Sequence, residues 1–164
     1  IKLIFIVLIL LVSLPFILYL IPEILQTPLR VPSNSPMYVT QKLYDAYHEI
    51  KNYSEENNKY PSADNWCDLI LPYMEEDIKR IFTSTKKINT NIALNPNAKP
   101  DSPDNVVLLF ECIGPSWNAY GQSELLVQKT RNGKPGCHVV FNDGQIEFIK
   151  PDQVKNLNWG NNEN

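Results

Sequence analysis

The sequence lacks the short motifs that identify most cofactor-dependent enzymes and metal proteins. It contains no C-x-x-C pair, no C-x-x-C-H haem attachment motif, no phosphate-binding loop and no Rossmann glycine pattern, and only six glycines occur in its 164 residues. Its basic residues are dispersed and its net charge is −3, which argues against a nucleic-acid-binding surface or an electrostatic membrane patch. We therefore expect no cofactor, no nucleic-acid partner and no enzymatic activity.

Charged residues are also missing from the N-terminal stretch Leu3–Pro22, which consists almost entirely of Leu, Ile, Val and Phe. About 20 apolar residues form a helix that spans a hydrocarbon core of about 30 Å. The alternative is a cleaved secretory signal, whose apolar core is usually about 7–15 residues long and ends in small residues. Tyr19–Glu23 offers no such small-residue site. The sequence thus predicts a retained transmembrane anchor over residues 1–23.

The charges that flank this stretch predict its orientation. Lys2 precedes it, whereas Glu23 follows it and the next cation is Arg30. Because cations favour the cytoplasmic side of a membrane span, we expect a cytoplasmic N-terminus. The remainder of the chain would then be periplasmic or otherwise extracytoplasmic.

Prolines mark the next segment, 24–36, which we expect to be an extended and fairly stiff linker. At its end, Ser35 and Pro36 resemble the cap and the first position of a helix. Apolar residues at spacings of three and four predict one amphipathic helix from about Met37 to about Asn57, packed against a sheet. Its apolar stripe consists of Val39, Leu43, Ala46, Ile50 and Tyr53.

The rest of the predicted domain, which covers residues 37–159, contains shorter elements. We expect Asp64 to cap a short helix that includes Trp66, and the Asn- and Pro-rich stretch Lys86–Pro103 to be a loop. The run Val106–Glu111 is typical of a buried strand. Further expectations are a turn at Ile78–Phe82, a short strand or edge segment at Leu125–Val127, a tail helix from Pro151, inward packing of Trp159 and a frayed end at 160–164.

Near the C-terminus, Gly136–Ile149 reads as two short strands joined by a tight turn. Asp143-Gly144 lies between alternating apolar runs and is a strong hairpin signal, because glycine tolerates the positive φ that such turns need. We interpret Asp143 and Gly144 as turn residues. The side chains predicted to form sheet core are Val139, Phe141, Ile146 and Phe148.

The three cysteines, Cys67, Cys112 and Cys137, are an odd set. Outside the cytoplasm, one disulfide plus one free thiol is the simplest arrangement. Cys112 ends one predicted strand and Cys137 begins another, so a bridge between them is one option, and Cys67 could equally pair with either. The pairing stays open because bridging depends on the Cα separation. A Cys/His metal site that uses His48 or His138 lacks supporting spacing.

The polar residues of the hairpin offer weak candidates for chemistry. His138 follows Cys137, but adjacent strand residues point to opposite faces, which disfavours a nucleophile–base dyad. Asp143 and Glu147 fit a turn and the polar face of a strand better than an acid–base pair. Asn142 and Asp143 lack the full ligand loop of a calcium site. We therefore predict neither catalytic nor metal-binding residues.

The order of anchor, long helix, short helix and antiparallel sheet is the order found in pilin-like proteins. Several local patterns agree, and together they cover most of the chain from about Leu43 to Trp159. They are Asn58-Lys59-Tyr60-Pro61, Asp64-Asn65-Trp66-Cys67, Leu71-Pro72-Tyr73, Asn95-Pro96-Asn97-Ala98, Val106–Glu111, Trp117-Asn118 with Gly121, Glu124-Leu125-Leu126 and the closing Phe-x-Asp-Gly-x-x-x-Phe pattern. On these residues the chain resembles bacterial type IV pilin-like and type II secretion pseudopilin-like proteins. The nearest pattern is that of a prepilin-type, processing-associated family that typically ends in a His, nine residues and Asp-Gly.

The chain departs from this family in three places. Where pilin precursors carry an acidic fifth mature residue, which helps to register subunits in a filament, this chain has Phe5. The proline-rich linker should separate the membrane helix from the long helix, which pilins usually join directly. The histidine expected ten residues before Asp143 is Gly133, and His138 stands in a different register, so no role of that histidine carries over.

The resemblance implies an α+β fold in which a pilin-like domain follows the anchor and linker. The function it implies is that of a non-catalytic, membrane-anchored structural or interaction subunit of a larger membrane or cell-surface assembly. Its partners would be the lipid bilayer and other protein subunits. The alternative is a minor pseudopilin of a type II secretion or type IV pilus system, and a ligand- or metal-binding sensor domain is a third reading.

Overall fold

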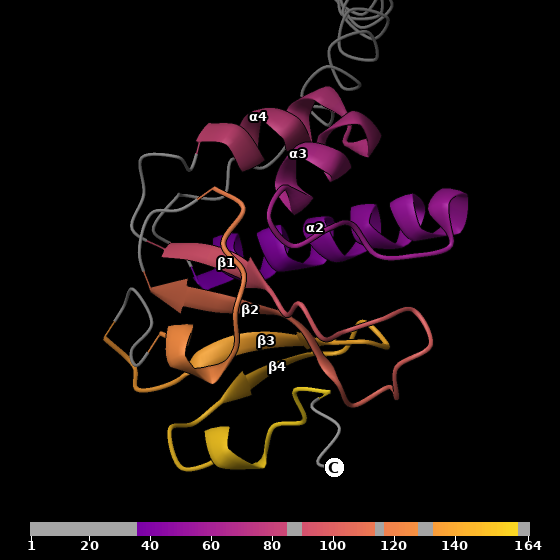
Figure 1. The fold of residues 1–164 in the computed structure, drawn as a ribbon. Helices are drawn as coiled ribbons and strands as arrows, with labels where there is room; N and C mark the ends of the chain where they lie inside the picture. Colours follow the sequence, from indigo (N-terminus) through magenta and orange to yellow (C-terminus); the bar gives the residue numbers. More distant parts are fainter. Residues whose placement is uncertain (1–35, 85–89, 114–116, 128–132, 161–164) are drawn as a thin grey trace, which may run out of the picture. The chain divides into compact units, whose positions relative to one another are not determined.

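A long helix packed on a four-stranded antiparallel sheet forms the centre of the domain (Figure 1). The computed structural model describes residues 36–84, 90–113, 117–127 and 133–160. The predicted anchor 1–23, the linker up to residue 35 and the tail 161–164 lie outside these ranges. Within the ranges, no helix is long and apolar enough to cross a bilayer. The elements are α2 (Pro36–Asn57), α3 (Trp66–Ile70), α4 (Glu76–Ser84), β1 (Thr90–Leu94), β2 (Val107–Ile113), β3 (Cys137–Phe141) and β4 (Ile146–Ile149), with short 3₁₀ helices at Leu71–Tyr73, Ser123–Leu125 and Val154–Asn156.

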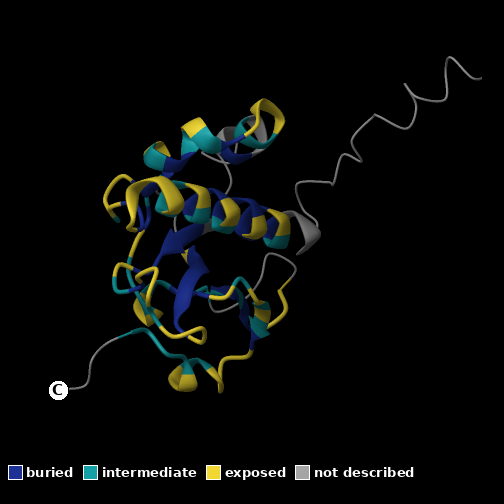
Figure 2. Cartoon of the chain, turned by 90° about the vertical axis from the view of Figure 1, so that its right-hand side faces the viewer, coloured by how far each residue is buried: buried dark blue, intermediate teal, exposed yellow. Residues whose placement is uncertain are grey.

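Helix α2 agrees with the predicted amphipathic helix to within one residue. It ends at Asn57, and Asn58 follows with φ of 56°, the left-handed conformation that commonly terminates helices. The predicted stripe is buried except at Tyr53, which is partly buried, and it joins the core cluster beneath the helix. Figure 2 shows that the opposite side of α2 is exposed.

The sheet order is β1-β2-β3-β4, and all pairs are antiparallel. The predicted hairpin is present as β3 and β4, with Val139 opposite Glu147. In the turn between β3 and β4, the Gly144 amide donates to the Phe141 carbonyl at 2.9 Å, and the Asp143 carboxylate accepts from the Gln145 amide. Gly144 has φ of 91°, so the turn uses the glycine as the sequence predicted.

Both faces of the sheet are covered by other segments, so the domain has a core cluster on each face and not only on the predicted one. One cluster lies under the helices and includes Leu109 and Val140; the other includes Phe110 and Val139 and is closed by segments near the C-terminus. Strand residues on both faces are therefore buried, and simple alternation fails. Of the four predicted hairpin core residues, only Val139 is fully buried, whereas Phe141, Ile146 and Phe148 are partly exposed.

Two further expectations were wrong. The predicted loop Lys86–Pro103 contains β1, a short edge strand that pairs with β2 and is flanked by Asn-rich sequence, which disguised it. Asp64 does not cap α3: the helix begins at Trp66, and its Cys67 amide donates to the Asn118 side chain at 2.7 Å. The cap comes from 51 residues away, so local sequence could not reveal it. Trp159 does pack inward, with its ring 5.2 Å from that of Phe110.

We expect Gly144→Ala to destabilise the fold by about 2 kcal/mol, because the left-handed conformation is costly for alanine. An added Cβ would also lie 2.7 Å from the Tyr47 ring. Gly133→Ala is the matched control, since Gly133 also has positive φ but no atom within 4 Å of the added Cβ. Chemical denaturation should show a clearly larger loss at Gly144. Equal losses of stability in the two variants would show that the Tyr47 contact does not contribute to the cost at Gly144.

Candidate interaction groove

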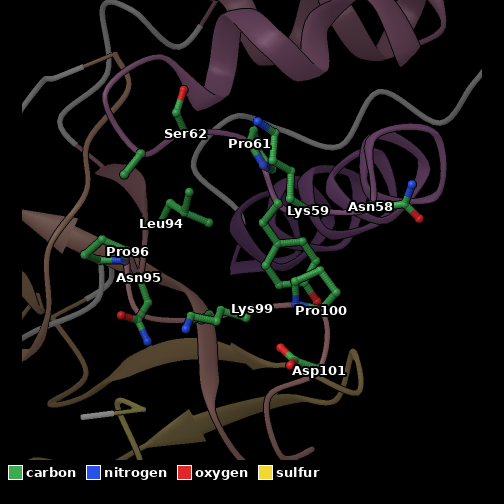
Figure 3. Close-up of a pocket in the computed structure, with 13 residues that line it drawn as sticks. Asn58, Lys59, Pro61, Ser62, Leu94, Asn95, Pro96, Lys99, Pro100 and Asp101 are labelled. Carbon is green, nitrogen blue, oxygen red and sulfur yellow. The ribbon is translucent and has the colours of Figure 1, made fainter. Parts of the chain in front are cut away.

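An open groove of about 590 Å³ lies between the segment that follows α2 and the segment that follows β1. The first wall is formed by residues 58–63 and the second by residues 94–101. Figure 3 shows Pro61 and Ser62 on one side, Asn95 and Pro96 on the other, and Leu94 between them. Volumes of about 300–1,000 Å³ are typical of binding pockets. The groove is therefore large enough to hold a small ligand or a few residues of a peptide.

Tyr60 holds the first wall in place through hydrogen bonds of its buried hydroxyl. Its side chain is 8% exposed, and its hydroxyl donates to Asn142 Oδ1 at 2.6 Å and accepts from Lys51 Nζ at 2.8 Å. Asn142 lies just after β3 and donates its own amide to the Ser102 carbonyl. The wall is thus tied to α2 and to the hairpin turn by a buried polar network. Burial raises the pKa of Tyr60 to about 12, so the hydroxyl keeps its proton at neutral pH.

Asn95 fixes the second wall. Its side chain is 1% exposed and donates to the carbonyls of Val107, at 2.6 Å, and Trp159, at 3.2 Å. It also accepts from the Asn97 amide at 3.1 Å, which closes a local turn. Because buried polar groups are costly unless they are paired, this arrangement holds the backbone in one conformation. Both walls are rigid before any ligand binds, which lowers the entropy cost of binding.

The groove carries more positive than negative charge. Lys59 and Lys99 are exposed, and Asp101 is the acidic residue among the described residues that line it. The side chains of the two lysines have no ion-pair or hydrogen-bond partner within the described ranges. Three prolines add rigid rings without backbone N–H groups. The exposed recognition groups are therefore two ammonium groups set among small apolar surfaces.

The three cysteines are free, buried thiols in the structure. Pairing between β2 and β3 runs to Phe110 opposite Val139, and Cys112 instead bridges to Leu126 on the neighbouring segment. A disulfide between Cys112 and Cys137 stays a prediction, as does any pairing of Cys67. Within the described ranges, no three His, Cys, Asp or Glu side chains are grouped so that they could hold a metal ion.

Cys137 and His138 contact different surroundings. Cys137 belongs to the cluster with Phe110, whereas Nδ1 of His138 lies 2.7 Å from Oε2 of Glu111. The same carboxylate oxygen accepts from the His138 amide at 2.6 Å, while the Glu111 carbonyl accepts from the Val127 amide at 3.1 Å. Glu111, 1% exposed, therefore bridges the point where β2 and β3 diverge. Glu111 was expected in a buried strand, but the contact of its carboxylate with His138 was missed, because that contact depends on the tertiary pairing of β2 with β3.

The buried charges on α2 were also missed. Lys42, Asp45 and Glu49 are each at most 8% exposed. The Lys42 ammonium lies 5.2 Å from the centre of the Phe82 ring, and burial lowers its pKa to about 8. Asp45 accepts from Gln41 at 2.8 Å, and burial raises the pKa of its carboxyl. These side chains support packing of α2 and lie outside the groove.

The free thiols predict a loss of stability at alkaline pH. Burial raises the pKa of Cys137 from 9.0 to about 12 and that of Cys112 to about 11. Their contribution is complete below pH 9 and is lost between pH 9 and the folded pKa, because only the unfolded chain releases these protons. Each thiol then costs about 1.4 kcal/mol per pH unit. Denaturation of the reduced protein at pH 8 and pH 10 should show that the free energy of unfolding drops less for Cys137→Ala than for the parent. Equal drops would contradict the raised pKa of the Cys137 thiol.

No protein-family model, curated protein or solved structure matches this chain. The groove itself was not predicted from sequence. Its walls are two segments about 36 residues apart, and only the tertiary fold places them side by side. The local signal available in advance was the recurrence of proline and lysine in both segments.

Proposed function

We propose that this protein is a non-catalytic, single-span membrane-anchored subunit whose pilin-like, extracytoplasmic domain binds other proteins of a larger membrane or cell-surface assembly. The observation that carries the interaction role is the groove, in which rigid walls present two unpaired lysine side chains. The anchor rests on the uncharged stretch Leu3–Pro22.

The state of the polar residues supports a binding role over chemistry. Every buried side-chain nitrogen or oxygen among the described residues has a hydrogen-bond partner. The side chains considered for catalysis or metal binding make internal contacts: His138 with Glu111, Asn142 with Tyr60, and Asp143 within the hairpin turn. In contrast, the groove offers exposed cations on a prearranged surface. The pilin-like part of the proposal draws on the long helix α2 packed on a four-stranded antiparallel sheet.

Site-specific photocrosslinking in intact membranes tests the proposal. A benzoylphenylalanine at Ser62 would face the groove, and one at Lys155 provides an exposed control position in a different part of the domain. We expect a discrete crosslinked product with another membrane protein from Ser62 and none from Lys155. The proposal fails if Ser62 yields no product in membranes where the protein is made at its normal level.

A further inference from the structure

We infer that the groove recognises an acidic segment of a partner polypeptide, with carboxylates held by Lys59 and Lys99. This inference rests on the proposed interaction role and specifies the chemistry of its partner. The chain as a whole has a net charge of −3, so a positively charged groove on it stands out from its surroundings. Charge complementarity of this kind guides specificity and association rate more than it adds raw affinity.

The two lysines belong to opposite walls. Lys59 is next to Tyr60, whose hydroxyl is held by Lys51 and Asn142, and Lys99 lies four residues after Asn95. In Figure 3 the two labelled lysines lie on either side of the groove, with Asp101 toward one end. An acidic ligand that lies along the groove can therefore contact both ammonium groups. Asp101 would disfavour a carboxylate at its own end, which restricts how the segment binds.

The surface between the lysines favours a polypeptide over a polyanionic polysaccharide. Pro96 and Pro100, which are exposed, and Ala63, which is partly exposed, supply small apolar contacts that suit aliphatic side chains placed between carboxylates. A polysaccharide site would offer an exposed aromatic face for sugar rings. Tyr60 is the aromatic residue among the described groove residues, and it is buried.

Fluorescence anisotropy with the full chain in a nonionic detergent tests the inference. The probe is a labelled dodecapeptide of four Glu-Ala-Pro repeats, and the same peptide with glutamine in place of glutamate is the neutral control. We expect the acidic peptide to bind at least tenfold more tightly than the neutral one. Binding should weaken as salt is raised, because the contacts are exposed.

Matched charge reversals assign the binding to the groove. We expect Lys59→Glu with Lys99→Glu to weaken acidic-peptide binding at least tenfold. Lys150→Glu with Lys155→Glu changes the net charge equally at exposed positions outside the groove and should change binding less than twofold. Equal effects of the two pairs, equal binding of the neutral peptide, or no binding of the acidic peptide would overturn the inference.

A binding measurement with an acidic polysaccharide tests the alternative class of ligand. Polygalacturonate that binds through Lys59 and Lys99 while the acidic peptide does not would also overturn the inference. Neither result depends on crosslinking from Ser62. A retained Ser62 crosslink with no acidic-peptide binding would therefore reject the acidic partner and leave the interaction role standing.

Discussion

Replacing Trp66 with alanine is expected to lower the free energy of unfolding by about 4 kcal/mol, near the upper end for a single core substitution. Trp66 is completely buried, and its ring packs edge-on against Phe82 at 6.2 Å between centroids. Its indole N–H donates to the Ala119 carbonyl at 2.9 Å. Alanine would therefore leave a large cavity and remove one of the two hydrogen bonds that this carbonyl accepts. Chemical denaturation monitored by circular dichroism would measure the loss.

The effect of Trp66 should extend to the groove. The carbonyl of Ala119 also accepts from the Leu94 amide, and Gly121 donates back to the Leu94 carbonyl. Loss of Trp66 removes one attachment of this segment and so loosens the wall that contains Leu94.

Two variants separate the contributions at this site. Trp66→Phe keeps an aromatic ring but loses the donor, and we expect it to cost about 2 kcal/mol. Tyr120→Ala removes an aromatic ring that is 51% exposed and should cost about 0.5 kcal/mol or less. A Trp66→Ala loss no larger than that of Tyr120→Ala would contradict the packing described for α3.

Asn95→Asp is expected to destabilise the fold by about 3–5 kcal/mol at neutral pH, although the two side chains have nearly the same shape. The substitution replaces two amide N–H donors with a carboxylate oxygen that faces the carbonyls of Val107 and Trp159. A buried, repelled carboxylate has a raised pKa in the folded state. The unfolded chain therefore releases its proton first, and the stability of the variant relative to the parent should fall as pH rises above about 4.

Asn105→Asp provides the control for this prediction. Asn105 is exposed, and its side-chain oxygen accepts a hydrogen bond from Asn158, which a carboxylate can also accept. We expect a change of about 0.5 kcal/mol or less and little dependence on pH. Denaturant titrations of both variants from pH 4 to pH 7 would test the pair. A pH-independent loss at Asn95 would indicate that the amide does not hold the groove wall in the manner described.

Features set by local sequence were predictable. The three- and four-residue spacing of Val39, Leu43, Ala46 and Ile50 gave the position of α2 and its buried side. Asp143-Gly144 gave the hairpin, because only a few residues tolerate the backbone of such a turn. In both cases, neighbours in sequence decide the structure.

Features set by distant contacts were not predictable. Strand β1 has only three apolar residues, Ile92 to Leu94, within an Asn-rich stretch, and its pairing with β2 defines it as a strand. The cap of α3 comes from Asn118, and the buried Glu111 is explained only by the divergence of β2 and β3. The groove has the same origin, since Tyr60 and Asn95 are fixed by Asn142 and Trp159 from later parts of the chain.

The proposed role as an anchored subunit of a larger assembly is tested by the mass of the protein as extracted from its native membrane. Purification in a mild detergent, followed by native mass spectrometry, would give that mass and the identity of any companion subunits. We expect a complex well above the 18.8 kDa of the chain, with at least one different membrane protein at a fixed ratio. Recovery of the chain alone, as a monomer, under conditions that keep other membrane complexes intact would contradict it.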